Sequence, residues 1–386
     1  MGKSGVPNND EFYMKIALRL AKKGLGFVNP NPPVGAVIVK DGNIIGRGYH
    51  TRFGALHAER EALLDAKKKG VDVSGATMYV TLEPCDHYGK TSPCTNAIIE
   101  SGIKRVVIAA RDPNPVSGDG IKKLLKNGIE VKVGVLEDEA KEVAKFFFKY
   151  VTTGLPYVTL KYASTLDGKI ADKIGSSKWI TQELRKEVHK LRSIHKAVLV
   201  GAETVLKDNP ILNVRLPKMK FKNPDVVVLD ENGRVLKKVI ADIDKFELFN
   251  PNYDRRVIIF SSNQCQNIEF PEYVKVKTPE NLSVENILKE LAKEGIDSLL
   301  IEGGASVFSQ FLPYADEVYG FYATKVFGKG KSIFEHLEIP VEESEIPFEI
   351  QNLKISKNMK ELMVVMRRCS QGLFSTYVKD TSMVRG

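Results

Sequence analysis

The chain is poor in cysteine, in tryptophan and in long apolar segments, and these scarcities exclude whole classes of protein. Four cysteines among 386 residues are too few for a fold held together by disulfides. No apolar run approaches the ~18–20 residues that a membrane-spanning helix requires. The first residues, MGKSGVPNND, lack the apolar core of a secretory signal. We therefore expect a cytoplasmic protein with no membrane partner.

Charge of one sign is in only mild excess. The net charge is +9, from 57 Lys and Arg against 48 Asp and Glu, and it is spread along the chain. A nucleic-acid binder usually carries a dense basic patch. The short run KKK at 67–69 is typical of the solvated end of a helix. A mild positive excess suits phosphorylated small molecules, so we expect a phosphorylated substrate or cofactor and no nucleic acid.

The pattern of apolar residues predicts two α/β domains, because 386 residues exceed one ordinary core. The segment TTGLP at 152–156 is the best boundary, so we expect domains at 8–152 and 155–369 and a frayed tail at 370–386. Strands alternate with helices in both, which favours a sheet with helices on both faces. The predicted helices are 11–23, 57–69, 121–126, 137–149, 181–193 and 284–294. The predicted strands are 34–39, 78–82, 106–108, 131–135, 157–162, 197–201, 225–230, 257–260, 298–302 and 317–327, with closing antiparallel strands in 345–368.

One split cluster of residues points to a reaction. His57 and Glu59 open a predicted helix, Cys85 follows a predicted strand, and Cys94 lies in the first turn of another helix. One His and two Cys can hold zinc and leave the fourth tetrahedral position open to water. A Glu two residues after the His can then carry protons between that water, the ring and the leaving amine. This pattern is the signature of zinc-dependent deaminases of amino-substituted bases.

Two features of the cluster bear on its use. If His50 or His87 were a fourth ligand, the site would be structural rather than catalytic; we favour His87 as a substrate contact. Eight residues separate Cys85 from Cys94, whereas nucleobase deaminases usually have the tighter Pro-Cys-x-x-Cys arrangement. The insertion adds a loop at the mouth of the pocket, where it can select the substrate.

Longer motifs identify a family. In the first half they are NPNPPVGAVIV at 29–39, HAE at 57–59, TLEPCDHYGKTSPC at 81–94 and DPNP at 112–115; in the second half they are KYASTLDGK at 161–169, WIT at 179–181, GAETVLKDNP at 201–210 and EGG at 302–304. Together they resemble the bifunctional deaminase/reductase family of riboflavin biosynthesis, over about residues 10–368. The resemblance implies a cytidine-deaminase-like three-layer α/β/α domain followed by a dihydrofolate-reductase-like α/β domain.

The resemblance also implies two reactions and the residues that serve them. The first domain would use zinc to deaminate 2,5-diamino-6-(5-phosphoribosylamino)pyrimidin-4(3H)-one, and the second would use NADPH to reduce the ribosyl group to ribityl. It makes His57, Cys85 and Cys94 the ligands of one zinc ion and Glu59 the proton carrier. The implied substrate contacts are Asn31, His87, Lys161, Ser177, Arg192, Leu212, Arg215 and Glu302. The implied NADP contacts are Ala163, Trp179, Thr204, Asp208, Gly304, Ala305, Ser306, Val307, Phe308, Ser309 and Gln310.

Local chemistry supports part of this assignment. EGG at 302–304 ends a predicted strand and opens a helix, where glycines let a phosphate approach the first N–H groups; a glycine pair there is also typical of a tight turn. Arg192 and Arg215 could clamp a phosphate through paired hydrogen bonds. The usual dinucleotide fold is not supported, because no G-x-G-x-x-G follows an early strand.

The sequence departs from the family pattern in two places and leaves two rival hypotheses. Asp86 stands where the family commonly has Ser, and Glu231, a poor neighbour for a cofactor phosphate, stands where it commonly has Ser or Thr. The first rival is a zinc-dependent nucleic-acid base deaminase with a C-terminal binding module, which the long spacing between the cysteines disfavours. The second is a zinc-stabilised scaffold without activity, which the intact Glu59 disfavours. We expect a homo-oligomer.

Overall fold

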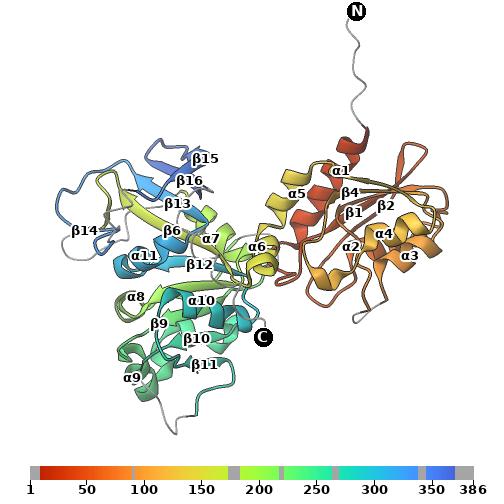
Figure 1. Cartoon of the computed structure of the whole chain (residues 1–386). Helices are drawn as coiled ribbons and strands as arrows, with labels where there is room; N and C mark the ends of the chain where they lie inside the picture. The colour runs from red at the N-terminus through yellow and green to blue at the C-terminus, as the bar shows by residue number, and fades with distance from the viewer. Residues whose placement is uncertain are drawn as a thin grey trace, which may run out of the picture. The chain divides into compact units, whose positions relative to one another are not determined.

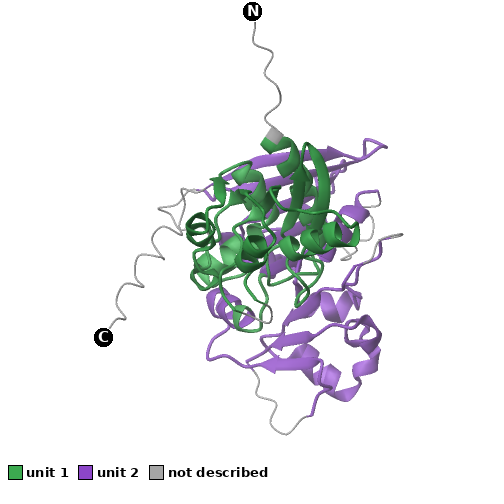
Figure 2. Ribbon diagram, turned by 90° about the vertical axis from the view of Figure 1, so that its right-hand side faces the viewer, with its two compact units in different colours: residues 1–156, 292–297 green, residues 157–291, 298–386 purple. Residues whose placement is uncertain are grey.

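The computed structural model (Figure 1) describes residues 9–88, 92–172, 183–216, 221–262, 269–337 and 345–369. The chain divides into two compact units (Figure 2): Met1–Pro156 with Ala292–Asp297, and Tyr157–Leu291 with Ser298–Gly386. The domain bounds expected from the sequence stay a prediction. Ser177, Trp179 and the segment 370–386 lie outside the described residues. No helix within the described ranges is both long and apolar enough to cross a membrane.

A five-stranded sheet forms the middle layer of the first unit, in the order β2-β1-β3-β4-β5. β1 runs antiparallel to both of its neighbours, whereas β3, β4 and β5 are parallel. The strands are β1 (Gly35–Lys40), β2 (Asn43–Tyr49), β3 (Thr77–Leu82), β4 (Arg105–Ala110) and β5 (Glu130–Val133). The helices are α1 (Asn9–Ala21), α2 (Ala58–Lys68), α3 (Cys94–Glu100), α4 (Gly120–Lys126), α5 (Glu137–Val143) and α6 (Lys145–Thr153).

The central strands of this sheet are apolar on both faces because helices cover both. Ala36 and Ile38 of β1 pack into a core with residues of α2, α3 and α4. Val37 and Val39, which point the other way, pack into a second core with residues of α1, α5 and α6. Successive residues of one strand thus contribute to two cores, which confirms the three-layer arrangement.

The second unit is built on a nine-stranded sheet in the order β11-β10-β9-β8-β12-β6-β13-β16-β15. The strands from β11 to β13 are parallel, and β16 and β15 close the sheet antiparallel. These strands are β6 (Tyr157–Thr165), β8 (Ala197–Gly201), β9 (Asp225–Leu229), β10 (Val257–Phe260), β11 (Val274–Lys277), β12 (Ser298–Gly303), β13 (Glu317–Ala323), β15 (Phe348–Ile355) and β16 (Glu361–Arg368). The helices are α7 (Arg185–Ile194), α8 (Ala202–Asp208), α9 (Arg234–Ala241), α10 (Val284–Lys293) and α11 (Ala305–Phe311), and β7 (Lys169–Ala171) pairs with β14 (Lys331–Ser332).

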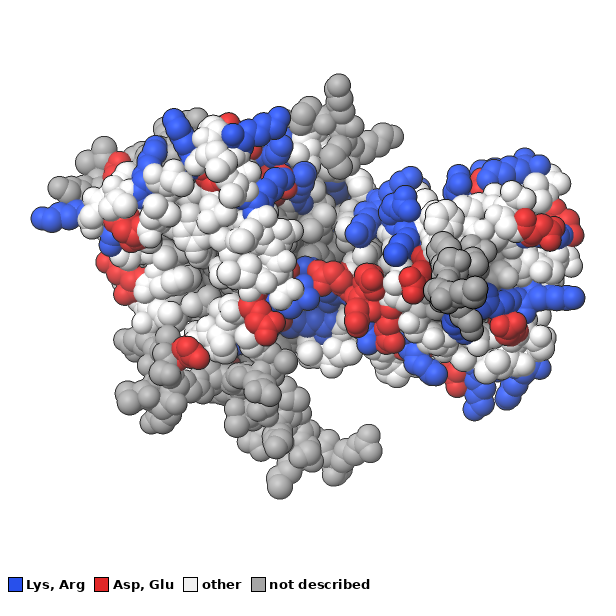
Figure 3. Space-filling model, turned by 90° about the horizontal axis from the view of Figure 1, so that it is seen from above, with Lys and Arg blue, Asp and Glu red and all other residues white. Residues whose placement is uncertain are grey.

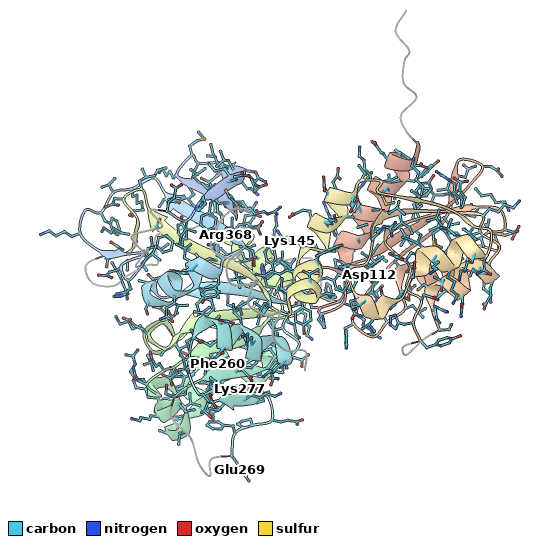
Figure 4. The ribbon with its side chains drawn as sticks, in the orientation of Figure 1. Asp112, Lys145, Phe260, Glu269, Lys277 and Arg368 are labelled. Carbon is cyan, nitrogen blue, oxygen red and sulfur yellow. The ribbon has the colours of Figure 1, made fainter. Side chains whose placement is uncertain are left out.

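The elements differ from the predictions at a few points. The helix predicted over 137–149 is two helices, α5 and α6, that meet at Ala144, where no Pro or Gly announces the break. α9 and β11 were not predicted, although α9 buries Val235, Leu236 and Val239 against the sheet. Phe260, labelled in Figure 4, is fully buried at the end of β10, as a strand covered on both faces requires.

Candidate active sites

Three metal-binding side chains meet in the first unit, and each lies at the end of a regular element. His57 is the N-cap residue of α2, Cys85 lies just beyond β3, and Cys94 is the first residue of α3. The Nδ1 atom of His57 lies 3.5 Å from Sγ of Cys85 and 3.4 Å from Sγ of Cys94. One donor atom from each residue lies within 4.8 Å of the others. The cluster predicted from the sequence is therefore assembled in the fold.

The spacing of these atoms fits a tetrahedral zinc ion. Zn–S and Zn–N bonds of about 2.3 and 2.0 Å at a tetrahedral angle place the sulfur and nitrogen atoms about 3.5 Å apart. Two thiols and an imidazole are also the donors that zinc prefers. His50 is engaged elsewhere, because its ring nitrogens contact Leu56 O and Asn31 Nδ2. Among the described residues the donor group contains His57, Cys85 and Cys94 and no fourth residue, which is the ligand count of a catalytic site.

Glu59 and Cys85 have perturbed acidities. Glu59 is in the first turn of α2, two residues beyond His57, and only 3% of its surface is exposed. Burial raises the pKa of its carboxyl group. Hydrogen bonds from Cys94 and His57 lower the pKa of the Cys85 thiol, despite burial. The site thus combines a stabilised thiolate with a carboxyl group whose pKa is raised by burial.

The segment that carries Cys85 is fastened to the chain that follows β4. The Glu83 carboxylate accepts hydrogen bonds from Ile121 N at 3.1 Å and from Asp112 N at 3.4 Å; Asp112 is labelled in Figure 4. Gly120 lies so close to this segment that a Cβ atom there would be 2.0 Å from Pro84 O. The DPNP motif at 112–115 thus belongs to the support of the cysteine segment.

Asp86, the departure from the family pattern, has partners in this chain. Its Oδ1 atom accepts hydrogen bonds from Thr95 Oγ1 at 2.7 Å and from Lys123 Nζ at 2.6 Å. Asp86 directly follows Cys85 and Thr95 directly follows Cys94, so this bond joins the residues next to the two cysteines. At the other end of the inserted loop, Arg60 of α2 donates to Ser92 O at 2.8 Å. Sequence reasoning missed these contacts, because residues far apart in the chain make them.

The expected substrate contacts of this site lie on loops. Asn31 Nδ2 is 3.3 Å from His50 Nε2, and the ring of His50 is 5.5 Å from that of His57. His50 thus lies between Asn31 and His57 of the donor group. The buried Nδ1 atom of His87 has no hydrogen-bond partner among the described residues, which suits a ring that meets a ligand.

A second charged cluster lies in the second unit. Lys161 of β6 and Glu302 of β12 lie on adjacent parallel strands, one residue beyond the pair Leu160 and Ile301. Arg192 of α7 donates to both Glu302 oxygens, from Nε at 2.6 Å and from Nη2 at 2.8 Å. Burial lowers the pKa of Lys161, against the charge of Glu302. Burial alone would raise the pKa of Glu302, but Arg192 and Lys161 together hold it below its ordinary value. The fold thus brings three of the expected substrate contacts together.

The expected cofactor contacts lie at the carboxyl ends of neighbouring strands. Gly304 is the N-cap of α11 with a φ of 88°, and a Cβ atom on Gly303 would lie 3.0 Å from Thr204 Oγ1. α8, with Thr204, and α11 therefore start close together, at the edge of the sheet where α/β folds bind ligands. Ala163 is on β6 and the exposed Asp208 ends α8. In α11 the buried expected contacts are Ala305, Val307, Phe308 and Ser309, and the exposed ones are Ser306 and Gln310.

Comparison with known proteins matches the first half of the chain to a deaminase domain and the second half to a reductase domain. The model of the cytidine and deoxycytidylate deaminase zinc-binding region matches residues 7–110, and that of the RibD C-terminal domain matches residues 156–362. The riboflavin biosynthesis protein RibD of Aquifex aeolicus is 44% identical over 93% of this chain and 98% of its own. RibD of Escherichia coli is 38% identical over 83% of this chain and 89% of its own.

Solved structures give the same result. The Thermotoga maritima diaminohydroxyphosphoribosylaminopyrimidine deaminase/5-amino-6-(5-phosphoribosylamino)uracil reductase is 54% identical with a TM-score of 0.86, covering 94% of this chain and 99% of its own. Acinetobacter baumannii RibD is 35% identical with a TM-score of 0.81, at the same coverage. Fold and sites therefore define a zinc-dependent deaminase joined to an NADPH-dependent reductase. The chain belongs to the RibD family of bifunctional enzymes of riboflavin biosynthesis.

Proposed function

We propose that the first site deaminates the diaminopyrimidine ribotide named for the Thermotoga relative and that the second reduces the deaminated product. In the first step water replaces the exocyclic amine at C2 of the pyrimidine and ammonia leaves. In the second, hydride from NADPH and a proton convert the ribosyl group to ribityl. The observation that carries the first assignment is the tetrahedral spacing of His57, Cys85 and Cys94 with one position left open.

His57, Cys85 and Cys94 would hold the zinc ion, which when bound supplies a Lewis acid that activates water. Glu59 would carry one proton of the attacking water to the ring nitrogen and then the second to the leaving amine. Its burial supports this role, because a raised pKa makes the carboxylate a stronger proton acceptor than an exposed glutamate. Asn31 and His87 would orient the pyrimidine.

In the reductase site, Lys161, Arg192 and Glu302 would face the sugar. Arg192 donates Nε and Nη2 to Glu302 and Nη1 to Asn213 O at 3.1 Å, so its orientation is fixed before substrate binds. Arg215 is exposed and is the side chain best placed to reach a phosphate. Leu212 and Ser177 complete the proposed substrate contacts, and the expected NADP contacts complete the reductase site.

The expected partners follow from this chemistry. The proposed substrates are small and phosphorylated. On the face drawn in Figure 3 basic and acidic side chains are interspersed, so this face gives no reason to propose a nucleic-acid partner. The homo-oligomeric state and the cytoplasmic location stay predictions.

Metal removal tests the proposal. Dialysis against a chelator should abolish ammonia release, and added zinc should restore it. His57→Ala should bind no zinc and release no ammonia, yet still oxidise NADPH when given the deaminated substrate. Ammonia release that survives in the metal-free His57→Ala protein would refute the zinc assignment.

A further inference from the structure

The expected substrate contacts Leu212 and Arg215 lie on an irregular segment, residues 209–216, that directly follows α8. Leu212 is 4% exposed and has a φ of 54°, in the left-handed region that is unfavourable for a residue with a Cβ atom. Such a backbone persists only where its surroundings impose it. The contacts of this segment therefore reveal what holds Leu212 and Arg215 in place.

Arg255 holds one end of the segment. Its Nη2 atom donates to Ile211 O at 2.5 Å, next to Leu212, and to Leu248 O at 3.1 Å. The guanidinium lies 4.9 Å from the centre of the Tyr253 ring. Arg255 is 7% exposed, and no carboxylate among the described residues accepts a hydrogen bond from it. Burying a cation that is hydrogen-bonded only to backbone carbonyls is costly, which indicates a role for Arg255 beyond packing.

His189 holds the other end. It lies on α7 one turn before Arg192, and its Nδ1 atom accepts a hydrogen bond from Arg215 N at 3.2 Å. Nδ1 can accept only while it carries no proton. The charged groups facing the ring are Arg192 from α7, Arg215 from the segment and Glu302 from β12. Burial, together with the two arginines, lowers the pKa of His189 to about 4, so the ring is neutral at physiological pH.

We propose that His189 and Arg255 are positioning residues of the reductase, which hold segment 209–216 from its two ends so that Leu212 and Arg215 face the sugar phosphate. The role rests on the proposed contact between Arg215 and substrate. Arg192, through Asn213 O, supports the middle of the same segment. Within the described part of the chain, the hydrogen bonds of the two side chains reach none of the expected cofactor positions, so their loss should weaken binding of the ribosylamino substrate and spare NADPH.

The test is steady-state kinetics on the full chain, with each reductase substrate varied in turn and ammonia release measured on the same preparation. His189→Leu should raise the KM for the ribosylamino substrate about ten-fold, and leave the KM for NADPH and the deamination rate within about two-fold. His189→Asn should keep the KM for the ribosylamino substrate close to the wild-type value, because Asn Oδ1 can take the place of Nδ1 as acceptor. Lys190→Met, next on the same helix and exposed, is the matched control.

Arg255→Met should also raise the KM for the ribosylamino substrate. Arg255→Lys can still reach one carbonyl, so its KM should lie between those of the wild type and Arg255→Met. An unchanged KM in His189→Leu, or an equal rise in both KM values, would overturn the proposal. Arg215→Ala distinguishes a failure of the proposed substrate contact from a failure of the positioning role. If it leaves the substrate KM unchanged, the proposed substrate contact fails; if it raises the KM while His189→Leu does not, the positioning role alone fails.

Discussion

The two proposed active sites differ in the structural elements that carry their expected ligand and substrate-contact residues. In the deaminase, the zinc-binding residues occupy the ends of regular elements: the N-cap of α2, the exit of β3 and the start of α3. In the reductase, Lys161 and Glu302 lie on strands, but Leu212 and Arg215 lie on an irregular segment that distant side chains support. The zinc donors are thus fixed by the regular elements that carry them, whereas segment 209–216 depends on hydrogen bonds from Arg192, His189 and Arg255.

The largest expected effect separates the two sites completely. Glu59→Gln keeps the shape of the side chain but removes its ability to exchange a proton, so deamination should fall about 10²–10⁴-fold. The reductase rate with deaminated substrate and the zinc content should stay at wild-type values. Glu61→Gln, on the same helix, is the control. Deamination at the wild-type rate in Glu59→Gln would remove Glu59 from the mechanism.

The buried ion pair of the reductase should matter next. Arg192→Met leaves Glu302 buried without its bidentate partner, and breaking such a pair costs about 3–5 kcal/mol. The free energy of unfolding in urea, followed through the second unit, should fall by this amount while ammonia release at low urea persists. Lys207→Met removes an exposed pair with Glu203 and should cost less than about 1 kcal/mol. Equal losses of unfolding free energy in the two variants would contradict the structural weight given to the buried pair of Arg192 and Glu302.

The brace beside the cysteines should have a moderate effect. Asp86→Ser restores the residue common in the family but removes the bonds to Thr95 and Lys123. Zinc affinity, measured by chelator competition, should fall about ten-fold. Lys123→Met should weaken zinc binding as well, because the Asp86 carboxylate then lies beside the thiolates without its counter-cation. The double variant should lose less zinc affinity than the sum of the two single variants. Strict additivity would show that the two residues act separately.

The smallest effect concerns acid stability of the first unit. Hydrogen bonds from Arg105, Lys132 and Tyr79 hold the pKa of Asp10 well below its ordinary value. A lowered carboxyl pKa stabilises the fold above the unfolded-state pKa of about 4, and this stability is lost as pH falls further. Asp10→Asn should therefore lower the melting temperature at pH 7 more than at pH 3. Asp41→Asn, at an exposed turn, should show no such difference.

The sequence was sufficient to predict the metal-binding residues but not the side chains that hold the surrounding segments in place. His57, Glu59, Cys85 and Cys94 were found because short motifs encode the ligand set. Most strands of the two large sheets were found because apolar runs encode burial on both faces, whereas the partly exposed β11 was not. Asp86, Arg60, His189 and Arg255 were not found, because their partners lie up to dozens of residues away and only tertiary packing brings them together. The break at Ala144 was missed because no Pro or Gly marks it in the sequence.

The most direct test of the two-site assignment supplies the full chain with the diaminopyrimidine ribotide and follows ammonia and product mass, with and without NADPH. Without NADPH we expect one ammonia per substrate and accumulation of the deaminated ribosylamino compound. With NADPH we expect the same ammonia and a ribitylamino product. A reduced product that still carries both amines, or no ammonia in either reaction, would contradict the assignment of deamination to the His57, Cys85 and Cys94 site.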